Sequence, residues 1–168
     1  EQYFRKQMEL LTSAGFDALG IGSMEEPGFL REAGIELPMY FDQGMYSWNH
    51  LAGAAMERYG ADRLTIPVEL NEREIRDSGV QGEMIVYGYL PMMISAQCIR
   101  KTTLGCSGKP EIMWLKDRKD MRFPVVNQCR FCYNTIYNSA PLSLLGLSEQ
   151  VTGLKPNAVR LNFTVEEP

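Results

Sequence analysis

Two hydrophobic periodicities alternate along the first half of the chain. Helices are predicted over 2–14, where apolar residues recur three and four positions apart, and over 25–33 and 49–58. The charged character of residues 69–77 predicts an exposed helix there. Short apolar runs typical of strands fall at 17–22, 38–41, 63–67 and 83–89. Because the connections between these segments are only a few residues long, the pattern predicts parallel strands linked by helices.

The alternation ends after Leu90. We expect no regular helix or strand between 91 and 110, followed by a β-hairpin with strands at 111–116 and 121–126. A helix is predicted over 143–151, with Gly153 after it, and residues 158–165 alternate as a final strand does.

These units amount to roughly half of an eight-stranded barrel, which usually needs about 250 residues. We therefore predict an α/β fold, a partial (β/α) TIM-type barrel with a Cys-containing β-hairpin insertion. Residues 1–168 are expected to form a single domain, the C-terminal portion of such a barrel, and an open sheet is the alternative. A half-barrel exposes sheet edges, so a homo-oligomer paired through an exposed edge is also expected.

The composition is that of an ordinary globular protein, with 45% hydrophobic and 23% charged residues. No apolar run approaches the roughly 20 residues that a membrane-spanning helix needs, so no membrane partner is expected. No signal peptide is visible, although the sequence opens at Glu1 and its start says little about targeting. We expect a cytoplasmic protein, since free thiols are typical of a reducing compartment.

Charge is unevenly distributed along the sequence. Residues 100–130 contain eight basic and three acidic residues, a net charge of +5, while the whole chain has a net charge of −4. A local basic field attracts phosphate and acidic groups, which makes RNA or an acidic protein one candidate partner. A solvated hairpin without a partner is the other interpretation.

The four cysteines all lie in a segment, residues 91–133, that we expect to bind metal. Their spacing is Cys98-x7-Cys106-x22-Cys129-x2-Cys132. Four thiolates suit tetrahedral zinc or an iron–sulfur cluster of the 4Fe-4S type, and a Cys-x2-Cys pair directs both of its sulfurs at one ion. The alternative is that some of these cysteines are small buried apolar residues.

The sequence contains few candidate catalytic groups. Asp42 and Glu69 lie just beyond the ends of predicted strands, at the barrel face where active sites lie, and Glu83 is a nearby acid. Such acids also serve as helix caps and loop anchors. His50 is the only histidine, so no Ser/His/Asp or Cys/His constellation is legible, and its place at a helix start also suits a surface residue.

One stretch resembles a known family. Residues 82–98 read GEMIVYGYLPMMISAQC and resemble the pattern of peptidase family U32, with Glu83, Gly88, Ser95 and Cys98 matching by position. Residues 127–133 (NQCRFCY) resemble a downstream Cys-x-x-Cys-Arg element of that family. The similarity extends clearly over residues 65–145 and more loosely upstream.

The chain departs from the family pattern at two positions. Pro91 stands where many members have a first cysteine, and Tyr87 stands where they have histidine. The resemblance therefore implies that Cys106 supplies the fourth sulfur, and that any role requiring the histidine is absent.

The resemblance implies a peptidase with a peptide substrate and a four-cysteine metal site. Other members of the family assist hydroxylation of RNA bases or of a quinone precursor and carry a four-iron cluster. The alternatives are thus an iron–sulfur-dependent RNA or small-molecule hydroxylation factor, or a non-catalytic metal-stabilised module that binds RNA or protein.

Overall fold

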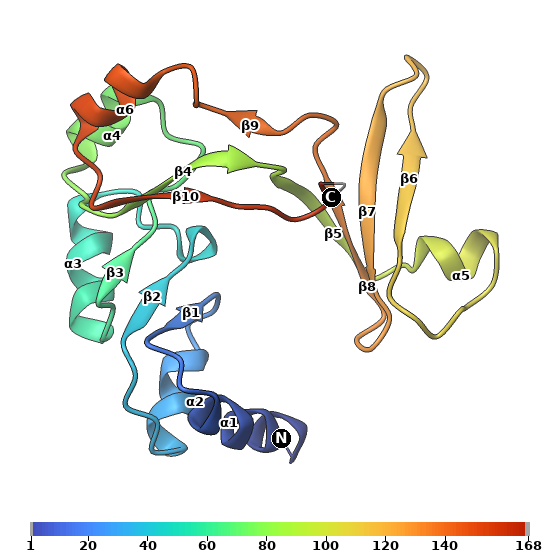
Figure 1. Cartoon of the computed structure of the whole chain (residues 1–168), viewed down its shortest axis with the longest axis horizontal. Helices are drawn as coiled ribbons and strands as arrows, with labels where there is room; N and C mark the ends of the chain where they lie inside the picture. Colours follow the sequence, from blue (N-terminus) through green and yellow to red (C-terminus); the bar gives the residue numbers. More distant parts are fainter. Residues whose placement is uncertain (1, 167–168) are drawn as a thin grey trace. The chain divides into compact units, whose positions relative to one another are not determined.

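The computed structural model describes residues 2–166, and the chain divides into two compact units (Figure 1). The first unit comprises Glu1–Ile85 and Glu149–Arg160, and the second comprises Val86–Ser148 and Leu161–Pro168. Strand β4 (Glu83–Gly88) begins in the first unit and ends in the second. The boundary between the units therefore falls inside a strand.

The first unit is built on parallel strands. Its three-stranded sheet has the order β1-β2-β3, made of β1 (Leu19–Ile21), β2 (Met39–Phe41) and β3 (Arg63–Leu64). Both pairings are parallel, and a parallel bridge from Thr65 to Glu83 continues the order to β4. Strand β10 (Ala158–Leu161) follows Asn157, whose N–H donates to the Gly82 carbonyl at 2.8 Å. The prediction of parallel strands is confirmed for this unit.

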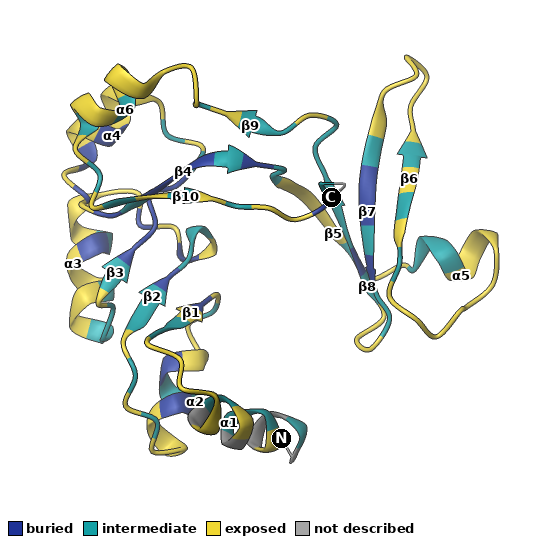
Figure 2. Ribbon diagram, in the orientation of Figure 1, coloured by how far each residue is buried: buried dark blue, intermediate teal, exposed yellow. Residues whose placement is uncertain are grey.

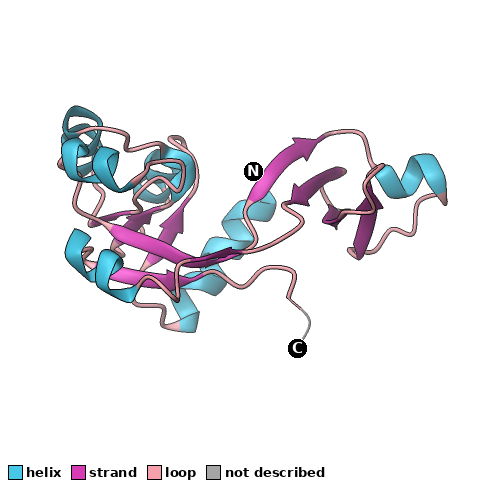
Figure 3. Cartoon of the chain, turned by 90° about the horizontal axis from the view of Figure 1, so that it is seen from above, coloured by secondary structure: helices cyan, strands magenta, loops and turns pink. Residues whose placement is uncertain are grey.

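Helices, cyan in Figure 3, alternate with these strands along the chain. Four lie within three residues of their predicted bounds, and the helix predicted over 143–151 begins five residues later, at Ser148. The helices are α1 (Gln2–Ala14), α2 (Glu26–Glu32), α3 (His50–Tyr59), α4 (Glu72–Ser78) and α6 (Ser148–Leu154), with a short 3-10 turn at Gln43–Met45. Asn49 caps α3 by accepting the N–H of Ala52 at 3.0 Å. Asn71 and Glu74 form a reciprocal capping box at the start of α4.

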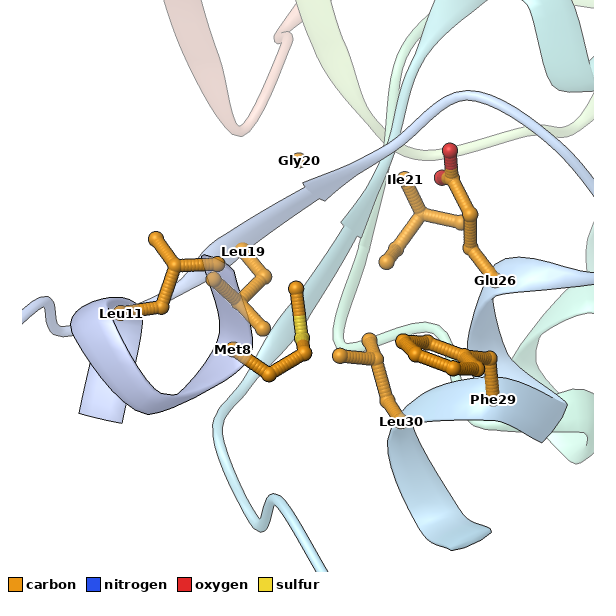
Figure 4. A pocket seen from close by; sticks show the side chains of 8 residues that line it. All are labelled: Met8, Leu11, Leu19, Gly20, Ile21, Glu26, Phe29 and Leu30. Atoms are coloured by element: carbon orange, nitrogen blue, oxygen red, sulfur yellow. The ribbon is translucent and has the colours of Figure 1, made fainter. Parts of the chain in front are cut away.

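A compact apolar core holds the first unit together. Its buried members are Ile21, Leu30, Phe41, Met45, Leu64 and Val80. Beside this core, an apolar hollow opens between α1, β1 and α2 (Figure 4); it is lined by Met8, Leu11, Leu19, Gly20, Ile21, Glu26, Phe29 and Leu30. The Glu26 carboxylate is held at its rim because Oε2 accepts the Gly22 N–H at 2.7 Å.

The second unit is antiparallel. Its four-stranded sheet has the order β5-β8-β7-β6, made of β5 (Pro91–Ser95), β8 (Tyr133–Tyr137), β7 (Arg122–Gln128) and β6 (Ile112–Lys116). Strand β9 (Leu142–Ser143) pairs with the end of β4, and the short helix α5 (Ile99–Thr103) follows β5. The predicted hairpin is confirmed as β6 and β7, with bounds shifted by one or two residues.

The prediction that residues 91–110 lack regular structure is wrong, because β5 and α5 lie there. The apolar residues of β5 carry no alternation, since Met92, Met93 and Ile94 are all exposed (Figure 2). Helix α5 has five residues, too few to display a helical period, and begins where the Cys98 sulfur accepts the Lys101 N–H at 3.5 Å. Strands β8 and β9 were also missed, and α6 continues through Gly153.

Pro124 and Gly88 occupy positions of the second unit that suit their unusual backbone properties. Pro124 lies in β7, but the pairing with β8 begins at Val125, so the missing N–H interrupts no bond of that ladder. Gly88 has φ of 141°, and a Cβ atom there would overlap the carbonyl oxygen of Asn162. Only glycine fits at this position without strain.

Taken over residues 2–166, the chain is a mixed α/β protein with three sheets and six α-helices. These residues do not close a barrel, so the predicted TIM-type arrangement is not confirmed. The same part of the chain contains no helix that is both long and apolar enough to cross a membrane.

Candidate active site and cysteine segment

Polar side chains form a row across the parallel strands of the first unit. Asp42 directly follows β2, Thr65 directly follows β3, and Glu83 is the first residue of β4. Phe41 is aligned with Leu64 and Thr65 with Glu83, so the three polar residues are at one level of the sheet. Residues at one level of neighbouring strands share a face, which brings two of the three predicted acids together.

Arg160, from β10, binds all three members of this row. Its Nη1 donates to Asp42 Oδ1 at 2.7 Å, its Nη2 donates to Thr65 Oγ1 at 3.1 Å, and its Nε donates to Glu83 Oε1. The other oxygen of Glu83 lies 3.7 Å from Nη1 of Arg63. A single guanidinium thus links three strands through charge-assisted hydrogen bonds.

The two acids of this polar row both act on the pKa of Arg160, and they differ in how far solvent reaches them. Burial lowers the pKa of the Arg160 guanidinium, but the hydrogen bond and charge of Asp42, followed by those of Glu83, outweigh burial and raise it above its ordinary value. The Glu83 side chain is 13% exposed and contacts two arginines, whereas Asp42 is 42% exposed. Glu83 is therefore the more enclosed of the two acids, and Asp42 is the one more open to solvent.

The remaining candidates lie apart from this row. Glu69 is exposed in the turn after β3 and does not bind Arg160. His50 is the exposed first residue of α3, as the surface interpretation expects. Arg160 was missed by sequence reasoning, although it is the one charged residue of the otherwise apolar strand β10, a signal that identifies it in retrospect.

The four cysteines lie in the second unit. Cys129 and Cys132 occupy the turn between β7 and β8, Cys98 precedes α5, and Cys106 follows it. The Cys129 thiol donates to the Lys109 carbonyl at 3.0 Å, three residues beyond Cys106 in the sequence.

A second contact brings Cys98 to the same end of the sheet. Asn134, two residues after Cys132, donates its Nδ2 to the Gln97 carbonyl at 2.8 Å, and Gln97 immediately precedes Cys98. Residues near Cys98 and near Cys106 therefore contact Asn134 and Cys129, at the β7–β8 end of the sheet.

The sulfurs are nevertheless not assembled around one point. Among residues 2–166, no three His, Cys, Asp or Glu side chains are close enough together to hold a metal ion. The geometry therefore does not confirm the expected metal site.

A buried amide with an unused N–H group lies beside Cys129. Asn127 is 1% exposed, its Oδ1 accepts the Cys129 thiol at 2.9 Å, and its buried Nδ2 has no hydrogen-bond partner in the described part of the chain. Rotating this amide by half a turn would direct Nδ2 at the sulfur, where an N–H donor stabilises a thiolate. The four cysteine sulfurs, which are soft donors, and this unused amide of Asn127 both suit a metal bound by thiolates.

These features define a mixed α/β protein with an arginine-bridged acidic row in one unit and a Cys-x2-Cys turn in the other. The sequence model of peptidase family U32 matches residues 2–157, nearly the whole chain. The chain therefore belongs to peptidase family U32, which confirms the resemblance seen in its sequence. No curated protein and no solved structure matched it.

Proposed function

We propose that this chain acts as a peptidase on peptide substrates. The observation that carries this proposal is the match to peptidase family U32 over residues 2–157. The arginine-bridged acidic row supports it, because a carboxylate at the carboxyl ends of parallel strands is a common source of acid–base chemistry.

Within this proposal, the members of the row have different roles. Asp42 accepts a proton from the attacking water, since it is the more exposed acid and Arg160 is bonded to only one of its oxygens. Arg160 fixes the orientation of the Asp42 carboxylate through this hydrogen bond. Glu83 and Thr65 hold Arg160 in place and do not contact the substrate.

The test is hydrolysis of unfolded casein and of gelatin by the full chain, comparing two matched variants. Asp42→Asn is expected to lower the rate by about 100-fold or more, the usual contribution of a general base. Glu69→Gln changes an exposed acid outside the row and should leave the rate unchanged. Equal activity of both variants would remove Asp42 from the mechanism, and no hydrolysis by the unaltered chain would end the peptidase proposal.

We further propose that Cys98, Cys106, Cys129 and Cys132 bind a metal. The contacts of Lys109 with Cys129 and of Gln97 with Asn134 support this, as does the unused amide of Asn127. A bound iron–sulfur cluster would supply one-electron transfer, whereas zinc would supply structural stability. The chain's own contribution is to hold four thiolates and to keep the Cys129 sulfur beside a buried amide.

The second candidate function, support of RNA or small-molecule hydroxylation, depends on which metal is bound. The measurement is metal and sulfide content with an absorption spectrum, on protein purified without oxygen. Iron with sulfide and broad absorbance near about 400 nm would favour this candidate. One zinc per chain would favour the peptidase, and four titratable thiols without metal would contradict the metal proposal.

We also propose that the first unit represents part of a (β/α) barrel. Its support is the parallel order from β1 to β3, its continuation to β4 through the Thr65–Glu83 bridge, and β10 beyond β4.

A further inference from the structure

Strand β6 presents a free backbone edge in the second unit. It is the outer strand of the order β5-β8-β7-β6. Asn127 donates to the Glu111 carbonyl at 3.1 Å, and Asp117 donates to the Met121 carbonyl at 3.0 Å, which fixes the phase of the β6–β7 ladder. Because hydrogen-bonded and non-hydrogen-bonded pairs alternate in an antiparallel ladder, Ile112, Trp114 and Lys116 direct their N–H and C=O groups away from β7.

The side chains beside this edge are apolar and accessible. Ile112 is 49% exposed and Trp114 is 48% exposed, and both lie on the same face of the sheet as Lys116. Devices that normally protect an edge are scarce here, since β6 has no proline and its register with β7 has no bulge. Lys116, at the end of the strand, is its one charged residue.

The charge next to this edge is positive. Residues 112–122 contain four basic and two acidic residues. Lys116 pairs with Asp120 at 2.6 Å, whereas Arg122, aligned with Lys116 in the ladder, has no acidic partner in the described part of the chain. An acidic group at this level of an added strand would complement Arg122.

We propose that the β6 edge binds an extended acidic–apolar peptide as an added antiparallel strand. Read from its N-terminus, the peptide places an acidic residue opposite Lys116, an apolar residue opposite Trp114 and another opposite Ile112, with any residue between them. The six outward backbone groups of β6 provide affinity, and the Trp114–Ile112 surface with Arg122 provides selectivity. This binding site goes beyond the proposed hydrolysis and does not depend on it.

The same edge suits a second copy of the chain less well. Antiparallel pairing of two β6 strands about Trp114 places Lys116 of each copy opposite Ile112 of the other. No acid then reaches Arg122, because Glu111 lies on the other face and is held by Arg100 at 2.6 Å. A separate acidic strand satisfies the charge that self-pairing leaves uncompensated.

The probe is a labelled peptide, acetyl-Thr-Glu-Thr-Val-Thr-Val-Thr-amide, titrated into the full chain and followed by fluorescence anisotropy. Two N-methylated versions test the geometry on unaltered protein. Methylating the first valine removes an N–H that faces β6 and should weaken binding by about tenfold or more, while methylating the threonine between the valines should leave it unchanged. Replacing the glutamate by lysine should weaken binding in a salt-dependent way.

On the protein side, Ile112→Lys should weaken binding by about tenfold, and Ile94→Lys is the matched control on the opposite edge strand β5. Hydrogen exchange should show new protection at the amides of Ile112, Trp114 and Lys116 when the peptide is bound. Four results would overturn the proposal: no binding, equal effects of the two methylations, loss of binding in Ile94→Lys alone, or peptide-independent protection with a doubled sedimenting mass. The last would show that a second copy occupies the edge.

Discussion

The two units of this chain are stabilised in different ways. The first packs helices against short parallel strands around a cluster of buried apolar residues, with Phe41 fully buried at its centre. The second is mostly antiparallel ladder, and many of its large apolar residues are exposed, including Met92, Met93, Ile94 and Trp114. Among its fully buried side chains are two asparagines, Asn127 and Asn134, next to the cysteine turn.

This difference teaches where each unit obtains its stability. A unit with a sufficient apolar core needs no other support, whereas a small unit without one usually relies on a metal, a cross-link or a partner. The second unit has candidates for two of these, its four free cysteines and a free strand edge at β6. We therefore expect metal binding by the cysteines, or strand addition at β6, to stabilise the second unit as well as to serve its function.

The largest expected effect tests the core of the first unit. Phe41→Ala removes a fully buried ring and leaves a cavity, which should lower the free energy of unfolding by about 4 kcal/mol. Urea denaturation followed by circular dichroism measures this loss. Phe16→Ala is the control, since Phe16 is 52% exposed and its truncation should cost little. Similar losses in both variants would mean that this core does not carry the stability of the unit.

The next effect tests the metal dependence of the second unit. Cys129→Ser should lower its stability by about 3 kcal/mol if the thiolates bind metal, because metal binding is coupled to folding. A chelator should destabilise the unaltered chain in the same way and leave Cys129→Ser nearly unchanged. If the serine variant and the chelator both have negligible effect in thermal denaturation, the second unit folds without metal.

A smaller effect tests the arginine-bridged acidic row. Arg160→Leu leaves Asp42 and Glu83 near one another without their shared cation, and should cost about 1–2 kcal/mol because the site is only partly buried. Arg63→Leu is the matched control, since Arg63 is only 3.7 Å from one oxygen of Glu83 and should cost less. Chemical denaturation compares the free energies of unfolding of the two variants. A larger loss of stability in Arg63→Leu than in Arg160→Leu would show that Arg160 is not the organising residue.

The smallest effect concerns alkaline pH. Burial, followed by the charges of Tyr133 and Glu166, raises the pKa of Tyr137 above its ordinary value of 10.0. The folded state therefore retains this proton longer than the unfolded state, and the stability that depends on it is present below pH 10.0 and lost as pH rises through the folded value. In the unaltered chain the urea midpoint should fall as pH rises above 10.0, and Tyr137→Phe should make this fall less steep. An equally steep fall of the midpoint in both proteins would argue against a titrating Tyr137.

Sequence reasoning located the first unit well because its elements carry their own signals. The helix caps at Asn49 and Asn71 and the apolar strand β4 can be recognised locally, and the structure has them within a few residues of the prediction. The second unit was predicted less well, since β5 and β8 pair with each other across about 40 residues and neither shows alternation in its apolar positions. Pairing of this kind depends on tertiary contacts that a local pattern does not contain.

The site shows the same division. Asp42 was identified from its place after a predicted strand and Glu83 as a nearby acid, but their common partner Arg160 lies 118 residues from Asp42. Glu69 had the same local signal as Asp42 and lies outside the row. Position after a strand predicts which end of the sheet a residue occupies, and does not predict which side chains a long-range guanidinium will bind.

Strand β4 has a consequence for how the chain can be divided. Separate domains are usually joined by exposed, irregular linkers, which proteases cut first. Here one of the three passages of the chain between the units lies between Ile85 and Val86, which are 2% and 6% exposed and lie inside one strand. Limited proteolysis should therefore nick the exposed Lys116–Asp120 turn before it separates the two units, and a truncation placed at their boundary would leave each half with a severed strand.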